Sequence, residues 1–288
     1  MGLSPEDPTV ETTTEREFAY GRRDFERVRR LIHERAGIAL GDGKAELVYS
    51  RLAKRLRALG IARFGDYIAL LEDGGHPEWE HFVNALTTNQ TDFFREGHHF
   101  PMLATHARAI HDRPVRVWSA ASASGEEPYS IAITLCETFE SLAPPVEILA
   151  TDLDTRVLSQ AREGVYPLEK VNAIDPERLR RFFLKGRGTR EGQARVRDAV
   201  RDLVTFRTLN LRDQHWDVEG PFDAIFCRNV LIYFDKPTQR QVLERLRERL
   251  EPGGIYFAGH AESLLHAADL FEPCGRTAYR ALGAKAHG

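Results

Sequence analysis

Apolar residues recur every three or four positions through the first quarter of the chain. This period predicts amphipathic helices, because it gathers apolar side chains on one face of a helix. A first helix of this kind ends at Gly37, and a second helix over residues 44–59 ends at Gly60. A third helix is predicted over residues 64–71. Together these elements indicate a small all-helical domain over residues 16–76.

The later part of the chain shows short apolar runs that alternate with helical segments. Runs 115–118 and 146–151 predict strands, and the apolar segment 129–139 predicts a helix between them. Asp154 is placed to cap a second helix, which ends before Gly164. This alternation is typical of a parallel sheet with crossover helices and predicts an α/β fold.

The segment 164–204 interrupts the alternation. It contains a short helix opened by Asp175 and Pro176, followed by a glycine-rich stretch over 186–192. We interpret the segment as an insertion that contains a small antiparallel sheet. The earlier pattern then resumes and predicts strands over 203–211, 222–227 and 255–258, with a helix over 235–250.

The composition is that of a soluble globular protein. Of 288 residues, 42% are hydrophobic and 29% are charged. No stretch approaches the roughly 18 apolar residues that a membrane-spanning helix needs, so we expect no integral membrane protein. Residues 1–15 are polar and acidic, and we interpret them as a disordered tail and not as a signal peptide. The cysteines lie far apart, which favours the cytoplasm over a disulfide framework: Cys136, Cys227 and Cys274.

The formal net charge of −3 hides a local asymmetry. Residues 1–15 carry four acidic side chains, whereas residues 16–66 carry thirteen Lys and Arg against seven Asp and Glu, a net charge of +6. The remainder, 67–288, then carries −5. The overall charge argues against a general nucleic-acid binder. A basic module in an acidic protein suits an acidic partner, although a solvated helix surface would show the same charge.

Two features predict a ligand site at the carboxyl ends of the first strands. The loop 119–125 has only small side chains and leads into a helix N-terminus, which favours an anionic group. It lacks the glycine pattern of dinucleotide-binding loops, which argues against a nicotinamide-dependent oxidoreductase. Asp152 ends the second strand, where a carboxylate can accept both ribose hydroxyls of an adenosine. The pair favours a cofactor that contains adenosine.

A third feature follows the strand 222–227. Arg228 offers a guanidinium that matches a carboxylate, and Tyr233 offers a hydroxyl. A surface ion pair is the plainer interpretation of an isolated arginine. No cluster of Cys and His has metal-ligand spacing, so we predict no metal site. The adjacent His98 and His99 are expected to point to different sides of a helix and to have structural or capping roles.

Four sequence runs resemble the CheR family, the methyltransferases of chemotaxis receptors. They are TTNQTDFFR at 87–95, WSAASASGEEPYS at 118–130, ATDLD at 150–154 and FCRNVLIYF at 226–234. The runs stand in the family's order, and the resemblance covers nearly all of residues 20–280. It implies methyl transfer from S-adenosylmethionine, which leaves S-adenosylhomocysteine, to glutamate side chains of chemoreceptor cytoplasmic domains, in chemotactic adaptation.

The resemblance also implies the fold and its division into domains. The fold is a class I S-adenosylmethionine-dependent methyltransferase (Rossmann-like) sheet with an inserted antiparallel β-subdomain, preceded by a small all-helical domain. We expect the following division: a tail, 1–15; a helical receptor-recognition domain, 16–76; a helical connector that contributes to the cofactor site, 77–112; and a methyltransferase domain, 113–283, with the β-subdomain at about 164–204. The protein is expected in the cytoplasm, recruited to membrane receptor arrays.

Residue roles carry over by motif matching. The resemblance implies cofactor contacts from Asn89, Thr91, Arg95, Glu127, Asp152, Asn210, Leu211, Cys227 and Arg228. It implies contact with the chemoreceptor helical bundle from Arg51, Lys54, Arg55 and Arg57 on the basic second helix. The pattern at Gly186, Gly188, Gly192 and Arg195 is similar to that of members that bind a C-terminal pentapeptide of the receptor.

The expected reaction is an in-line displacement that needs no general base, because a glutamate acceptor is already ionised at neutral pH. We expect Arg95 to bind the cofactor's carboxylate, and Arg228 and Tyr233 to face the acceptor. One alternative stays open, a catalytically silent protein that senses the cofactor or docks on receptors. A methyltransferase for a small molecule or an RNA would leave the receptor-facing features unexplained.

Overall fold

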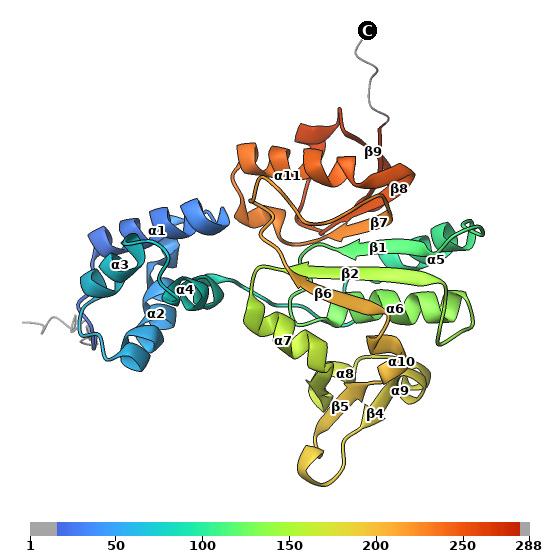
Figure 1. Ribbon diagram of the computed structural model, residues 1–288, viewed down its shortest axis with the longest axis horizontal. Coiled ribbons are helices and arrows are strands. Elements are labelled where there is room, and N and C mark those ends of the chain that lie inside the picture. The colour runs from blue at the N-terminus through green and yellow to red at the C-terminus, as the bar shows by residue number, and fades with distance from the viewer. Residues whose placement is uncertain (1–15, 283–288) are drawn as a thin grey trace, which may run out of the picture.

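Four helices form the N-terminal part of the computed structural model, which describes residues 16–282 (Figure 1). They are α1 (Arg22–Ala36), α2 (Ala45–Leu59), α3 (Phe64–Glu72) and α4 (Glu78–Leu86), with the short helix η1 (Asp42–Lys44) before α2. Their apolar faces meet in one core, in which Ile32, Leu52 and Phe64 are fully buried. The spacing of these apolar residues places them on the inner faces, as the helical period predicts.

A seven-stranded sheet forms the second part of the molecule. Its order is β6-β2-β1-β7-β8-β10-β9, and the strands are parallel except β10, which runs antiparallel to both neighbours. The bounds are β1 (Val115–Ser119), β2 (Val146–Asp152), β6 (Val204–Thr208), β7 (Phe222–Cys227), β8 (Leu250–Ala258), β9 (Phe271–Gly275) and β10 (Ala278–Ala281). The chain reverses its direction along the sheet beside β1, so loops meet at the carboxyl ends of β1 and β7.

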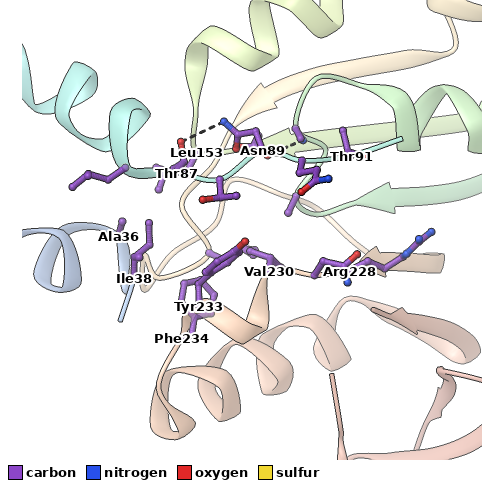
Figure 2. Close-up of a pocket in the computed structure, with 18 of the residues that line it drawn as sticks. Ala36, Ile38, Thr87, Asn89, Thr91, Leu153, Arg228, Val230, Tyr233 and Phe234 are labelled. Carbon is purple, nitrogen blue, oxygen red and sulfur yellow. Dashed lines mark hydrogen bonds between the residues drawn. The ribbon is translucent and has the colours of Figure 1, made fainter. Parts of the chain in front are cut away.

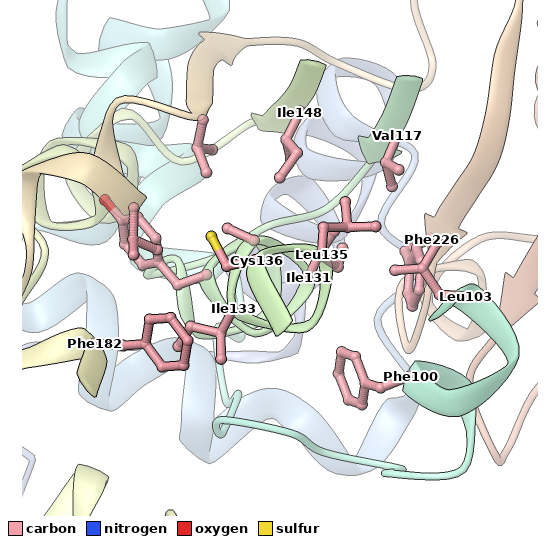
Figure 3. Close-up of a cluster of buried hydrophobic side chains, with 14 of the residues drawn as sticks. Phe100, Leu103, Val117, Ile131, Ile133, Leu135, Cys136, Ile148, Phe182 and Phe226 are labelled. Carbon is pink, nitrogen blue, oxygen red and sulfur yellow. The ribbon is translucent and has the colours of Figure 1, made fainter. Parts of the chain in front are cut away.

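Two hydrophobic cores cover the two faces of this sheet. One core packs α5 (His99–Arg108) and α6 (Glu126–Thr138) against the sheet, and Figure 3 shows Leu135 and Cys136 beside Ile148 and Val117. The other includes α11 (Lys236–Glu248). Successive strand residues alternate between the cores, because their side chains point to opposite faces. Val117 lies in the first core and Trp118 in the second.

A second, three-stranded sheet lies between α7 (Thr155–Glu163) and β6. It is antiparallel in the order β3-β5-β4 and confirms the small sheet predicted for this segment. The strands are β3 (Val165–Pro167), β4 (Phe183–Lys185) and β5 (Gln193–Val196), accompanied by α8 (Leu168–Val171), α9 (Pro176–Phe182), η2 (Gly188–Arg190) and α10 (Asp198–Arg201). Phe93 packs edge-to-face on Tyr166 and Phe183, which fixes this sheet against the segment that follows α4.

Several predicted boundaries differ from those observed. α6 begins at Glu126, ahead of the predicted start at 129, and β6 is shorter than the predicted strand 203–211. The strand predicted over 255–258 begins earlier, because β8 starts at Leu250, and its register with β7 shifts between Phe222 and Ala224. Two short helices, η3 (Leu231–Tyr233) and η4 (Leu265–Ala267), carry no apolar period and were not predicted.

Other expectations concern the membrane, the cysteines and the tail. In the part of the chain from 16 to 282, no helix combines the length and apolar character that a membrane crossing requires. The three cysteines are free, as the sequence predicts. The predicted tail, 1–15, lies outside the described residues.

The end of α1 joins the helical domain to the sheet domain. His33 Nε2 lies 3.0 Å from Asp235 Oδ2, and the Ala39 N–H donates to the Tyr233 carbonyl oxygen at 2.8 Å. Gly37 lies between these contacts with a φ of 73°, and a Cβ atom there would lie 3.1 Å from the Phe234 ring. Two features therefore favour glycine at this position: the left-handed backbone and the close approach of the Phe234 ring.

Gly37→Ala is expected to destabilise the protein more than Gly60→Ala does. Gly60 also ends a helix with a positive φ of 66°, but no atom lies within 4 Å of its added Cβ. Both variants lose ~1 kcal/mol or more to the left-handed backbone. Gly37→Ala adds about 1–3 kcal/mol of overpacking. Urea unfolding followed by circular dichroism measures the difference, and equal losses would contradict the packing argument.

Candidate active site

A cavity of about 330 Å³ lies where the helical domain meets the carboxyl ends of the sheet strands (Figure 2). Its volume lies within the range of small-molecule sites, about 300–1,000 Å³. Residues from both domains line it. They include Ala36, Ile38, Leu47 and Arg51 from the helical domain, Thr87–Asp92 and Arg95 from the following segment, and Ala120, Ala121, Ala123, Glu127, Asp152, Leu153, Leu209–Leu211, Arg228–Val230, Tyr233 and Phe234 from the sheet domain.

Asp152 lies at the end of β2 and on the wall of the cavity. It is 9% exposed, and its carboxylate accepts the Ala123 N–H at 2.8 Å and the Asp154 N–H at 2.9 Å. Burial raises the pKa of Asp152 to about 6, although both backbone donors act in the opposite direction. Ala120, Ala121 and Ala123 leave the neighbouring loop without bulky side chains, so a ligand can approach the carboxylate closely.

Asp154 has no exposed surface and links two parts of the site. Its Oδ1 accepts the first N–H groups of α7, from Arg156 and Val157, which confirms the predicted cap. Its Oδ2 accepts the Thr87 hydroxyl at 3.0 Å and the Asn89 amide at 2.7 Å. Sequence reasoning found the cap but missed this second role. A buried carboxylate thus fixes the segment after α4 over the sheet.

Asn89 and Thr91 lie on this segment and face the cavity, as predicted from the resemblance (Figure 2). The Asn89 amide group also donates to Thr87 Oγ1 at 3.3 Å. The Thr91 carbonyl oxygen accepts from Lys170 Nζ of α8 at 2.8 Å. The small antiparallel sheet and its helices therefore help to position the cavity wall.

Arg228 is buried below the cavity in a cluster of charged groups. It is 6% exposed, and its Nη2 donates to the Arg95 carbonyl oxygen at 2.6 Å. Glu127 Oε2 lies 3.5 Å from Nη1, and Glu96 Oε2 lies 3.9 Å from Nη2. Burial raises the pKa of Glu127, while Arg228 and the hydroxyl of Ser119 oppose that shift. The guanidinium and the carboxylates stabilise each other in a region with little water.

Arg95 and Tyr233 have different surroundings from Arg228. The Arg95 side chain is exposed and donates from Nη1 to the Gln90 carbonyl oxygen at 3.1 Å. Tyr233 is half-buried and lies across the cavity from Asn89 and Thr91 in Figure 2. The two arginines of the cavity wall therefore differ: the Arg95 side chain is exposed, whereas the Arg228 guanidinium is buried among charged groups.

Glu262 positions the loop that carries Arg228 and Tyr233, and sequence reasoning missed it. Its Oε1 accepts the N–H groups of Val230 and Leu231, both at 2.9 Å. Its Oε2 accepts the Gly259 N–H. Burial raises the pKa of Glu262, and the three backbone donors oppose the shift. An acidic residue four positions after an apolar strand was the available signal, but Val230 and Leu231 lie about thirty residues away in the sequence.

His98 and His99 do not point to different sides, and that expectation is wrong. Their Nε2 atoms lie 3.2 Å and 2.8 Å from Thr277 Oγ1, so both rings face the residue that precedes β10. Burial lowers the pKa of His99 to about 3, and the Arg228 charge adds to the shift. Potential ligand atoms of Glu96, His98 and His99 lie within 4.8 Å of one another. The nearby guanidinium already provides a positive charge for Glu96, so we assign this cluster to the support of Arg228.

Most residues predicted to contact the cofactor line this one cavity, with two qualifications. Cys227 does not line it, because its side chain is fully buried in the core beside α11. Asn210 lines it, but its side-chain amide donates to the Arg35 carbonyl oxygen and its oxygen accepts the Arg212 N–H. The Asn210 side chain is thus already engaged within the protein, and the Cys227 carbonyl oxygen accepts the Tyr256 hydroxyl at 3.2 Å. The others in the cavity wall are Asn89, Thr91, Arg95, Glu127, Asp152, Leu211 and Arg228.

The four cations predicted to meet a receptor differ in their contacts. Arg51 donates from Nη1 to three backbone carbonyls near the end of α4, and Arg55 forms two bonds of 2.8 Å with the buried Glu78. Arg57 pairs with Glu17 at the surface, and Lys54 is exposed. Arg51 and Arg55 are therefore engaged within the helical domain, and the exposed basic surface of α2 is smaller than the sequence suggests.

The glycine pattern of the predicted peptide site lies away from the cavity, in the turn between β4 and β5. The Gly186 N–H donates to the Gln193 carbonyl oxygen at 2.8 Å, and Arg195 pairs with Asp198 at 3.0 Å. A groove there is lined by residues of β4 and β5 and by four arginines: Arg187, Arg190, Arg195 and Arg201. β4 pairs only with β5, so one of its edges is left unpaired within the described residues.

Comparison with known proteins matches most of the chain to one family. Residues 23–87 match the family model "CheR methyltransferase, all-alpha domain", and residues 89–280 match "CheR methyltransferase, SAM binding domain". The chain is 52% identical to chemotaxis protein methyltransferase 2 of Pseudomonas aeruginosa, over 91% of this chain and 94% of that protein. It is 49% identical to the chemotaxis protein methyltransferase of Salmonella typhimurium, over 88% of each chain.

A search of solved structures finds weaker likenesses. The glycopeptide N-methyltransferase MtfA complexed with sinefungin matches with a TM-score of 0.35 and 19% identity, over 67% of this chain and 60% of that chain. A likeness of this strength carries no argument about function.

Proposed function

We propose that this chain, which belongs to the CheR family of S-adenosylmethionine-dependent methyltransferases, forms methyl esters on glutamate side chains of chemoreceptors. The observation that carries the proposal is the cavity, in which the carboxylate of Asp152 and the buried Arg228 lie at the carboxyl ends of β2 and β7, the two strands that flank β1. A silent sensor of the cofactor is not favoured, because the predicted catalytic side chains Arg95, Arg228 and Tyr233 all line the cavity.

The residues of the cavity fit S-adenosylmethionine. Asp152 would accept the ribose hydroxyls, because it keeps free lone pairs beside its two backbone donors. Asn89, Thr91 and Leu211 would line the rest of the site. The carboxylates of Asp152 and Glu127 border the cavity, and they suit a ligand that carries a positive charge.

When bound, the cofactor would supply a methyl group on a positively charged sulfur; the methyl group would pass to a carboxylate oxygen of the acceptor and leave S-adenosylhomocysteine. No proton moves in this displacement, because the acceptor is ionised from the start. The protein's task is therefore to hold the acceptor in line and to exclude water. The burial of Arg228, and the residues that the helical domain contributes to the cavity wall, would help both to position the acceptor and to exclude water.

We assign different roles to the three proposed catalytic residues. The Tyr233 hydroxyl, on the wall of the cavity, would donate a hydrogen bond to the acceptor carboxylate. Arg228 would attract the acceptor carboxylate electrostatically without a close hydrogen bond, because Glu127 and the Arg95 carbonyl oxygen already engage its guanidinium. Such an arginine orients an oxygen without binding it so tightly that it loses nucleophilicity. Arg95 would bind the cofactor's carboxylate.

Receptor recognition is proposed at two places. Lys54 and Arg57 lie exposed on α2 and would meet the acidic helical bundle of the receptor. The groove at β4 and β5 would bind the receptor's C-terminal pentapeptide by strand addition. Such a tether raises the local concentration of receptor without new contacts at the cavity. Both contacts would recruit the protein to membrane receptor arrays.

The affinity for S-adenosylhomocysteine is expected to fall at acid pH. Ribose hydroxyls donate to the ionised carboxylate, and the pKa of Asp152 is raised to about 6, so protonation competes with binding below that pH. Affinity should therefore fall about tenfold from pH 7 to pH 5. Asp152→Asn should bind weakly at pH 7 and lose this dependence, whereas Asp213→Asn, at an exposed site outside the cavity, should keep it. Isothermal titration calorimetry at pH 5–8 measures both.

Methyl transfer itself is tested with cofactor labelled in the methyl group and with receptor-containing membranes. We expect label on the receptor that base releases as methanol, which identifies a glutamate ester. Tyr233→Phe should lower turnover about tenfold or more, a barrier increase of ~1.4 kcal/mol, while cofactor affinity is kept. Tyr20→Phe, outside the cavity, is the control. Tight cofactor binding without transfer would instead support the silent sensor.

Titration with a peptide of the receptor's C-terminal sequence tests the tether. We expect one binding site, and Arg195→Ala should weaken it about tenfold if the arginine meets a carboxylate. No detectable binding, with the helical bundle still methylated, would remove the tether and leave the methyltransferase proposal intact.

A further inference from the structure

Arg51 of α2 binds the end of another helix and not a surface partner. Its Nη1 donates to the carbonyl oxygens of Ala85, Leu86 and Thr87, at 3.4, 3.2 and 2.8 Å. These carbonyls belong to the last turn of α4 and the residue that follows it. Such groups lack partners within a helix and carry the negative end of its dipole. A guanidinium in this position therefore fixes where α4 ends.

The same residue, Thr87, connects this contact to the cavity. Its carbonyl oxygen accepts from Arg51, and its hydroxyl donates to the buried Asp154. Asn89 follows two residues later and donates to the same Asp154 oxygen. The segment that begins at Thr87 is therefore held from one side by the helical domain and from the other by the sheet domain.

The inner end of α2 is also part of the cavity wall. Leu47 and Arg51 line the cavity together with Thr87–Asp92 (Figure 2 shows Thr87, Asn89 and Thr91). By contrast, Lys54, one turn further on, is exposed. Arg51 and Lys54 therefore have different surroundings, although they belong to the same basic stretch of the sequence.

We propose that Arg51 is a positioning residue for cofactor binding: it fixes the end of α4 and through it the segment 87–91 that forms one wall of the site. This role rests on the assignment of the cavity to S-adenosylmethionine and replaces the expected receptor contact at Arg51. Through Arg51, the helical domain would contribute to the affinity for the cofactor.

Arg51→Met tests the proposal, because methionine keeps an unbranched side chain but cannot donate. We expect S-adenosylhomocysteine to bind about tenfold more weakly, measured by calorimetry without any receptor, and Arg51→Lys to restore part of the loss. Arg27→Met is the matched control, since Arg27 pairs with Glu72 in the same domain and does not line the cavity. It should lower stability but leave the affinity of the folded protein unchanged.

Two further measurements separate positioning from direct contact. Combined with Asn89→Ala, Arg51→Met should add less than its single effect, because both variants act on one segment. 5′-Methylthioadenosine, which lacks the amino-acid part of the cofactor, should also bind Arg51→Met more weakly. A loss confined to S-adenosylhomocysteine would indicate direct contact with the carboxylate and overturn the proposal.

An unchanged affinity for S-adenosylhomocysteine, together with a raised KM for the receptor, would return Arg51 to the receptor surface. Loss of stability with normal affinity in the folded fraction would make it merely structural. Either result would overturn the positioning role. Neither would affect the methyltransferase assignment, which depends on base-labile label on the receptor.

Discussion

The carboxylate of Asp154 is the contact on which the cavity depends. It has no exposed surface, so its charge is stable only because several donors surround it. One oxygen accepts the N-terminal N–H groups of α7, and the other accepts Thr87 and Asn89. The same group therefore begins a helix of the sheet domain and fixes the segment that leaves the helical domain. Its loss would remove two of the contacts that fix one wall of the cavity.

Burial of charge organises the rest of the site as well. Arg228 stands between two carboxylates, and Glu262 holds three backbone N–H groups of the loops around it. Each group is nearly removed from water, and burial raises the pKa of both Glu127 and Glu262. Such groups are stabilising only in one arrangement, because any displacement leaves a charge without its partner. The cavity is thereby preorganised for a ligand whose own charge changes during the reaction.

Local signals in the sequence predicted the elements but not the contacts between them. Asp154 stands before a helical segment and Gly37 after one. Their roles as helix cap and helix end depend only on residues within one turn, so both could be predicted without knowledge of the fold. The second role of Asp154 joins it to residues more than sixty positions away, and Glu262 reaches back about thirty. The motif at 226–234 placed Cys227 in the site, but the alternation of side chains along β7 buries its thiol on the other side. Such pairings arise only when the sheet order is known.

The charges of the basic segment, residues 16–66, likewise could be counted from the sequence, but their contacts could not be predicted from it. The segment's excess of six positive charges follows from counting, but counting does not show where each cation is used. Arg27 and Arg30 pair with Glu72, Arg55 with Glu78, and Arg51 binds carbonyls. Paired cations still contribute to the net field, which steers an acidic partner over about 10 Å at moderate salt. Contact in the docked complex needs cations that are free to reach it. The net field of the helical domain therefore depends on all its charges, whereas only exposed cations such as Lys54 can contact an acidic partner directly. The half-buried Arg51 is engaged by carbonyl oxygens at the cavity wall instead.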